Sequence, residues 1–159
     1  LIKGGVITDL LHNRETSFKM NIRSNAASRS VEFDKEPIIR MSNTFIEPGD
    51  YDITELLSDI KKGVYIKNFM EWNIDDRREN QRYVGFEAYL IKNGELDINV
   101  KSPVLELTSK KFWSSVDARS KNLDFKAANC GKGEPMQGAP VWTGAPDVRL
   151  RNIRIGNRS

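Results

Sequence analysis

Hydrophobic and polar residues alternate over short stretches of this chain, and turn residues separate the stretches. Apolar pairs flank Gly4-Gly5 near the start, and the same arrangement returns around Asn93-Gly94. Both dipeptides accept the positive φ angles that a two-residue hairpin turn requires. The pattern therefore predicts β-hairpins over residues 1–7 and 90–96. Further short strands are expected at residues 38–41, 83–90 and 96–100.

Helical spacing is clearest in the segment that follows Asp52. Asp52 can cap a helix, Glu55 completes a capping box three residues later, and Gly63 can end the helix. The apolar residues of this segment recur every three or four positions and form one stripe: Ile53, Leu56, Leu57, Ile60 and Val64. A second short helix is expected over residues 108–116.

The rest of the pattern decides the fold class. Residues 14–34 are polar and are expected to form a long loop or a loosely ordered segment, and glycines and prolines divide the final third into short strands and turns. The length of 159 residues suits one domain. We predict a single α+β domain over residues 1–159, with a strand-rich, antiparallel, barrel- or sandwich-like sheet and about two helices.

Composition narrows the class of protein. Apolar residues make up 38% of the chain, and no run approaches the ~20 residues that a bilayer requires, so no membrane span is expected. The single cysteine excludes an internal disulfide and fits a reducing compartment, so we expect a cytoplasmic protein. One cysteine and one histidine are also too few for a four-ligand structural zinc site.

The net charge of +3 is concentrated at one end. Residues 148–159 contain no acidic residue and four arginines: Arg149, Arg151, Arg154 and Arg158. Such a cluster can contact nucleic acid or a membrane, or it can be an edge strand whose cations face water. The absence of a lysine run and of interleaved aromatics favours the edge strand, so nucleic acid is not expected as a partner.

Few residues offer catalytic chemistry. The chain has no phosphate loop, no Cys-x-x-Cys pair and no His-Glu-x-x-His motif. His12 follows an apolar pair and is interpreted as structural. Cys130 lies among small residues that would let a ligand approach, and Lys132 nearby would favour its thiolate. A buried, unreactive thiol is the alternative for Cys130.

Several sequence blocks together resemble the TldD/PmbA family, also called "modulator of DNA gyrase". The blocks are Arg40-Met41-Ser42-Asn43-Thr44, residues 60–65, residues 87–95, Cys130-Gly131-Lys132, residues 140–146 and residues 153–156. They follow one another in the family's order from one end of the chain to the other.

The resemblance implies a zinc metallopeptidase of the TldD-like branch. In that branch two histidines of a His-Glu-x-x-x-His helix and one later cysteine hold the metal, and Cys130 matches the cysteine. Three protein ligands leave a position for water, and the glutamate of the helix would act as general base. That helix is missing from this chain, and the family's order places it before Leu1. We therefore expect the chain to be the C-terminal domain of a longer protein.

The resemblance also implies partners. The substrates would be small or unstructured peptides, and Asn43, Gly131 and Lys132 are the possible cleft residues. The other partners would be the missing N-terminal part and a family member in a homo- or heterodimer. Zinc is expected in the intact protein, whereas this chain alone should bind it weakly and be inactive. The alternatives are a non-catalytic assembly domain and a gyrase- or DNA-associated regulator.

Overall fold

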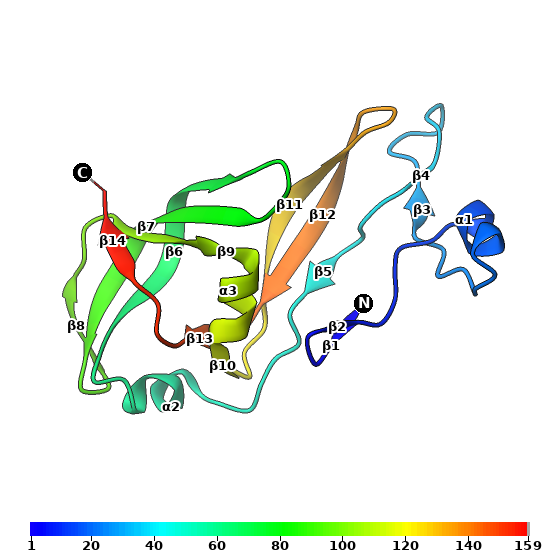
Figure 1. Cartoon of the computed structure of the whole chain (residues 1–159). Coiled ribbons are helices and arrows are strands. Elements are labelled where there is room, and N and C mark those ends of the chain that lie inside the picture. Colours follow the sequence, from blue (N-terminus) through cyan, green and yellow to red (C-terminus); the bar gives the residue numbers. More distant parts are fainter. Residues whose placement is uncertain (159) are drawn as a thin grey trace. The chain divides into compact units, whose positions relative to one another are not determined.

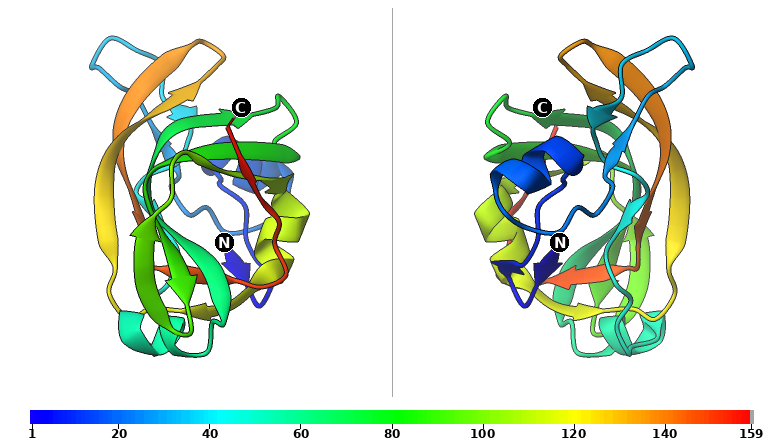
Figure 2. Two further views of the ribbon diagram at one scale, coloured as in Figure 1. Left: turned by 90° about the vertical axis from the view of Figure 1, so that its left-hand side faces the viewer. Right: turned by 90° about the vertical axis from the view of Figure 1, so that its right-hand side faces the viewer.

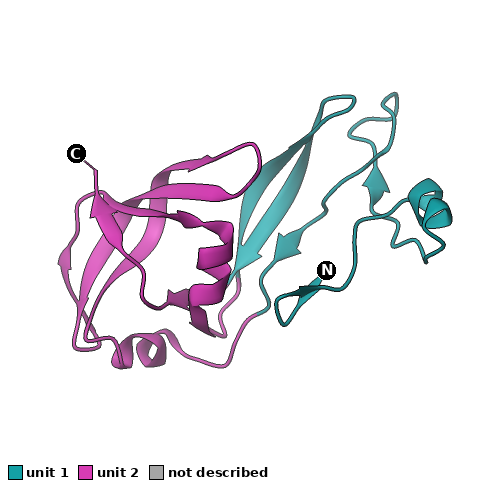
Figure 3. Ribbon diagram, in the orientation of Figure 1, with its two compact units in different colours: residues 1–47, 124–145 teal, residues 48–123, 146–159 magenta. Residues whose placement is uncertain are grey.

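The computed structural model describes residues 1–158, which divide into two compact units (Figure 3). Residues 1–47 and 124–145 form the first unit, and residues 48–123 and 146–158 form the second. Within the described residues, each helix is too short or too polar to cross a membrane.

The second unit is built on a five-stranded antiparallel sheet (Figure 1). Its strands are β6 (Lys62–Ile74), β7 (Asn80–Lys92), β8 (Glu95–Asn99), β9 (Pro103–Thr108) and β14 (Ile155–Asn157). Their order is β14-β9-β7-β6, and β8 pairs with β7. The long strands β6 and β7 curve side by side in Figure 2. Asn93 and Gly94 take φ angles of 51° and 85°, which confirms the expected β7–β8 hairpin.

Two helices and a strand pair complete this unit: α2 (Ile53–Ser58), α3 (Ser109–Ser115), β10 (Val116–Arg119) and β13 (Val148–Leu150). The expected helix over residues 108–116 is confirmed, since the Thr108 hydroxyl accepts a hydrogen bond from the Lys111 amide at 3.1 Å. The buried apolar residues of the unit come from α2 and the sheets: Leu56, Leu57, Val84, Ala88, Ile91, Val104 and Ala118.

Helix α2 is shorter than its apolar stripe predicts. Asp52 and Glu55 form the expected capping box, but the helix ends at Ser58 rather than at Gly63, which lies in β6. The chain after the helix forms hydrogen bonds with the β7–β8 turn instead of continuing the helix. The amides of Asn93 and Gly94 donate to the carbonyls of Lys61 and Ile60. Strand pairing therefore overrides the helical pattern.

The first unit contains three small sheets and one helix. Its elements are β1 (Ile2–Lys3), β2 (Val6–Ile7), α1 (Arg14–Lys19), β3 (Ser28–Arg29), β4 (Ile38–Ile39), β5 (Thr44–Phe45), β11 (Asp124–Lys132) and β12 (Gln137–Ala145). The β1–β2 hairpin turns at Gly4-Gly5, as expected. Strand β3 pairs with β4, and a three-stranded sheet has the order β11-β12-β5, in which β5 runs parallel to β12.

Helix α1 was not expected, because residues 14–34 read as a loop. Its start is fixed by Asn13, whose side-chain oxygen accepts from the Thr16 amide at 2.8 Å, while the Thr16 hydroxyl accepts from the Asn13 amide. This is a capping box with threonine in place of the usual glutamate. A single helical turn and a half leaves no apolar stripe to recognise.

The predicted fold class is confirmed. The structure is a strand-rich α+β fold whose sheets are antiparallel apart from the β5–β12 pair. None of the sheets within residues 1–158 closes into a barrel, so the sandwich-like alternative fits.

Candidate functional site

Cys130 lies near the end of β11, opposite Ala139 of β12. Directly opposed residues of an antiparallel pair project to the same face of the sheet. On β12 that face is buried, because Gln137, Ala139 and Val141 are buried while the residues between them are exposed. The thiol therefore lies on the packed face of the hairpin and is half-buried.

Two polar contacts link this end of β11 to the segment around β4. Arg40 Nη2 donates to the carbonyl oxygen of Cys130 and, at 3.1 Å, to that of Gln137. In return, Lys132 Nζ donates to the carbonyl oxygen of Ile39. Cys130 and Lys132 are two residues apart on one strand, so their side chains share a face. The ammonium group of Lys132 bonds a backbone carbonyl, and its effect on the thiol stays a prediction.

Gly131 occupies the opposite face of β11. A Cβ atom at this position would meet no atom within 4 Å, so the strand is open to approach here. The predicted cleft residues thus divide between two faces, with Lys132 on the face of the thiol and Gly131 on the other.

Asn43 precedes β5 and contacts β12 rather than β11. Its Oδ1 accepts a hydrogen bond from the Trp142 amide at 2.9 Å, immediately before the Thr44–Thr143 pairing of β5 with β12. The side chain prolongs the strand pairing by one hydrogen bond. This contact gives Asn43 a structural task in the same three-stranded sheet that holds Cys130.

His12 makes a local contact at α1 and is not part of the Cys130 site. Its side chain is 3% exposed and its Nδ1 lies 3.3 Å from the Thr16 hydroxyl oxygen, at the start of α1. Among residues 1–158, no group of three or more His, Cys, Asp or Glu side chains could hold a metal ion. A half-buried thiol fits zinc as one donor, since thiolate is a preferred zinc ligand, but the remaining donors must come from elsewhere.

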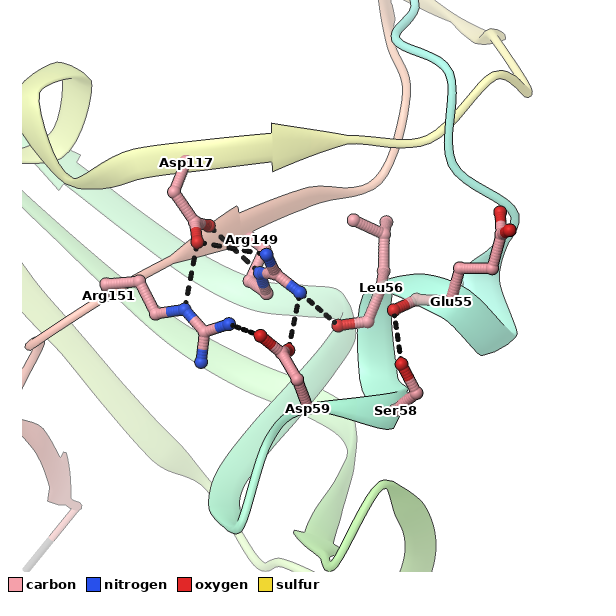
Figure 4. A network of polar contacts seen from close by, with 7 residues as sticks. All are labelled: Glu55, Leu56, Ser58, Asp59, Asp117, Arg149 and Arg151. Atoms are coloured by element: carbon pink, nitrogen blue, oxygen red, sulfur yellow. Dashed lines mark hydrogen bonds and ion pairs between the residues drawn. The ribbon is translucent and has the colours of Figure 1, made fainter.

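A second polar cluster explains part of the basic terminus (Figure 4). Arg149 bonds Asp117 and Asp59, and Arg151 bonds the same two carboxylates. These hydrogen bonds, chiefly those of Arg149, hold the pKa of Asp117 below its ordinary value. The interpretation of a solvated edge is wrong for Arg149, whose side chain is 12% exposed, whereas Arg154 is exposed. Asp59 and Asp117 lie far from the arginines in sequence, so the cluster could not be foreseen.

The structure adds Arg40 and Gln137 to the site as residues to which the sequence assigned no role. The signal for Arg40 was a single charge within the apolar run Ile38-Ile39-Arg40-Met41. An isolated charge in an apolar strand is often buried and bonded to the backbone. Gln137 carried no comparable signal, because it follows a turn in a polar stretch.

Comparison with known proteins decides the family. Residues 1–157 match the model of the PmbA/TldA metallopeptidase C-terminal domain. The chain belongs to this family. A metalloprotease of Methanothermobacter thermautotrophicus is 35% identical over 98% of this chain and 34% of its own length. A metalloprotease of Methanocaldococcus jannaschii is 36% identical over 94% of this chain and 32% of its own length.

Two further similar proteins extend the comparison. A zinc metalloprotease TldD homologue of Saccharolobus solfataricus is 22% identical over 98% of this chain and 34% of its own length. The crystal structure of TldE from Thermococcus kodakarensis shares the fold with a TM-score of 0.75 at 13% identity, over 99% of this chain and 33% of that one. The chain thus spans about one third of the length of the curated relatives it matches.

Proposed function

We propose that this chain is the C-terminal domain of a zinc metallopeptidase and that Cys130 is one of the metal ligands. The observation that carries the proposal is the position of the only cysteine. It lies half-buried and held by its backbone near the end of β11, in a chain that matches a metallopeptidase C-terminal domain over residues 1–157. The name zinc metalloprotease of the Saccharolobus relative supports zinc as the metal.

The thiolate of Cys130 would hold zinc together with ligands from the rest of the protein. When bound, zinc supplies a water whose pKa is lowered toward neutrality, together with polarisation of the scissile carbonyl. Within this chain, Arg40 and Lys132 join the end of β11, which bears the thiol, to the β4 segment.

The peptide would bind as an additional strand. Strand β11 is at the end of its sheet, and within residues 1–158 no strand pairs with its outer edge. Such an edge presents backbone N–H and C=O groups that an extended peptide can pair with, and the hydrogen bonds do not depend on its sequence. The open space at Gly131 leaves room for a peptide paired along this edge to extend over the face of β11 opposite the thiol. This mode of binding favours small or unstructured peptides.

The other partners follow from the missing ligands. A site with one donor on this chain requires further donors from the rest of the protein, and a related subunit of the family would be the dimer partner. The intact protein would then enclose a site to which this chain contributes one ligand and one strand edge.

The arginine-rich terminus gives little support to a role in binding DNA. Arg149 and Arg151 already bond Asp59 and Asp117, so their charges are largely compensated within the chain. Measured binding to DNA with a steep dependence on salt concentration would support that function.

The experiment compares the full-length protein with this chain alone. Both are loaded with zinc and assayed on an unstructured peptide and on a stably folded protein. We expect the full-length protein to cleave the peptide only, and this chain alone to be inactive. A full-length protein that binds no zinc and cleaves neither substrate would favour a non-catalytic assembly domain and would contradict the proposal.

A further inference from the structure

Arg40 is a buried cation bonded to backbone carbonyls. Its side chain is 2% exposed, and its Nε and Nη1 atoms have no hydrogen-bond partner within the described residues. The structure gives it no ion pair with a carboxylate in that part of the chain, and the Oε1 atom of the neighbouring Gln137 is also unpaired. Because a buried charge without a counterion is unfavourable, a neutral side chain would be expected here unless the contacts that Arg40 makes are needed.

Those contacts converge on the residue that carries the thiol. A single nitrogen, Nη2, donates to the Cys130 carbonyl on β11 and to the Gln137 carbonyl on β12. Gln137 pairs with Lys132 in the register, two positions along from the Cys130–Ala139 pair. Arg40 therefore bonds both strands at the end of the hairpin, one of them at the residue that carries the thiol.

The hydrogen bonds of Arg40 restrain an end of the hairpin that would otherwise open readily. Only Gly131 and Lys132 separate Cys130 from the turn at residues 133–136, and strand ends open more readily than strand centres. Lys132 adds one bond to the Ile39 carbonyl, next to Arg40 in sequence. The two bonds run in opposite directions between the β4 segment and β11, and together they fix the backbone that bears Cys130.

We propose that Arg40 is a positioning residue that fixes the Cys130 thiolate for metal binding. This inference rests on the proposed function, in which Cys130 is a zinc ligand. It assigns to Arg40 the task of fixing a ligand's orientation through the backbone. Partners that orient a metal ligand typically contribute about 10- to 100-fold to metal affinity or activity.

Arg29 provides a matched control. Its Nη2 also donates to two carbonyls, those of Met41 at 3.3 Å and Pro140 at 3.2 Å, and its Nε is likewise buried without a partner. Pro140 lies on the same hairpin, opposite Asn129, so Arg29 anchors β12 one position away from Cys130. It makes no hydrogen bond to Cys130 within residues 1–158.

The test uses the full-length protein with Co²⁺ in place of zinc. Thiolate-to-cobalt charge transfer gives a near-ultraviolet band that reports the Cys130–metal bond independently of activity. For Arg40→Met we expect Co²⁺ affinity to fall about 10- to 100-fold and the band to weaken at saturating metal. Arg29→Met should keep both the affinity and the band, although it also removes two hydrogen bonds to backbone carbonyls.

Wild-type affinity and band intensity in Arg40→Met would overturn the inference. If Arg40→Met does not fold, Arg40→Lys replaces it, because lysine keeps the cation but cannot reach both carbonyls in the same geometry. A folded Arg40→Lys protein with an unchanged band and affinity would likewise overturn it. Cys130→Ala separates the two proposals: a band that persists in this variant refutes Cys130 as a ligand, whereas a band lost there and unchanged in Arg40→Met refutes only the role of Arg40.

Discussion

The carboxylate of Asp117 accepts two parallel hydrogen bonds from Arg149, one from Nε at 2.9 Å and one from Nη2 at 3.0 Å. This bidentate geometry is the strongest form of the arginine–carboxylate pair. Arg149 also bonds Asp59 at 2.6 Å and the Leu56 carbonyl at 3.0 Å (Figure 4). One guanidinium thus joins β13, β10 and the end of α2 within the second unit.

Removal of this carboxylate should destabilise the protein. We expect Asp117→Ala to lower the free energy of unfolding by about 1–3 kcal/mol, because Arg149 would be left largely buried with part of its hydrogen bonding unmet. Denaturant unfolding measures the change, and Asp76→Ala, at an exposed position in the turn after β6, is the matched control. Equal effects of the two substitutions would show that the network adds nothing to stability.

The same pair predicts a dependence of stability on acid pH. The bonds from Arg149 and Arg151 lower the pKa of Asp117 in the folded state, so its contribution is present above the ordinary carboxyl pKa of about 4 and is lost as pH falls through the lowered value. Between pH 6 and pH 2 the wild type should lose more stability than Asp117→Asn. Parallel pH profiles of the two proteins would contradict this.

Tyr65 predicts a change at alkaline pH. Burial and the neighbouring Asp147, which accepts a hydrogen bond from the phenol at 3.1 Å, raise the pKa of Tyr65 to about 12. A raised pKa means that the contribution of this phenol is complete below its unfolded value of about 10 and is lost as pH rises toward 12. Tyr65→Phe should remove one high-pKa step from the ultraviolet titration of tyrosine. An unchanged titration would refute the assignment.

An added methyl group should have different effects on stability at two glycines. At Gly85 a Cβ would lie 2.8 Å from Pro103 Cγ, so Gly85→Ala should destabilise the sheet by about 1–3 kcal/mol. At Gly131 a Cβ meets open space, so Gly131→Ala should leave the thermal midpoint unchanged.

If a peptide lies beside β11, however, Gly131→Ala in the full-length peptidase should raise KM by about tenfold, or roughly 1.4 kcal/mol. Steady-state kinetics on one unstructured peptide measures this, with Gly133→Ala in the adjacent turn as control. An unchanged KM would remove Gly131 from the peptide site.

Local signals in the sequence account for much of the fold. The turns at Gly4-Gly5 and Asn93-Gly94 and the cap at Thr108 depend on residues adjacent in the chain, so their chemistry is readable from the sequence. The end of α2 was mispredicted because it depends on hydrogen bonds from the distant β7–β8 turn. The short helix α1 carried only the Asn13–Thr16 signal.

The candidate site likewise combines a residue that local sequence signals indicate with contacts between residues distant in the sequence. Cys130 could be selected from its small neighbours and from the family resemblance. The bond from Arg40 to its carbonyl joins residues that are 90 positions apart, and Leu56 and Asp59 are equally remote from Arg149. Such contacts depend on tertiary structure, so sequence patterns alone could not predict the residues that hold the thiol in place.

The zinc content of the full-length protein, wild type against Cys130→Ala, tests the central claim most directly. Native mass spectrometry measures metal stoichiometry on folded protein, and matched thermal midpoints of the metal-free forms show that the fold is intact. We predict one zinc per chain in the wild type and loss of that zinc in Cys130→Ala. Full zinc occupancy in folded Cys130→Ala protein would contradict the assignment of Cys130 as a metal ligand.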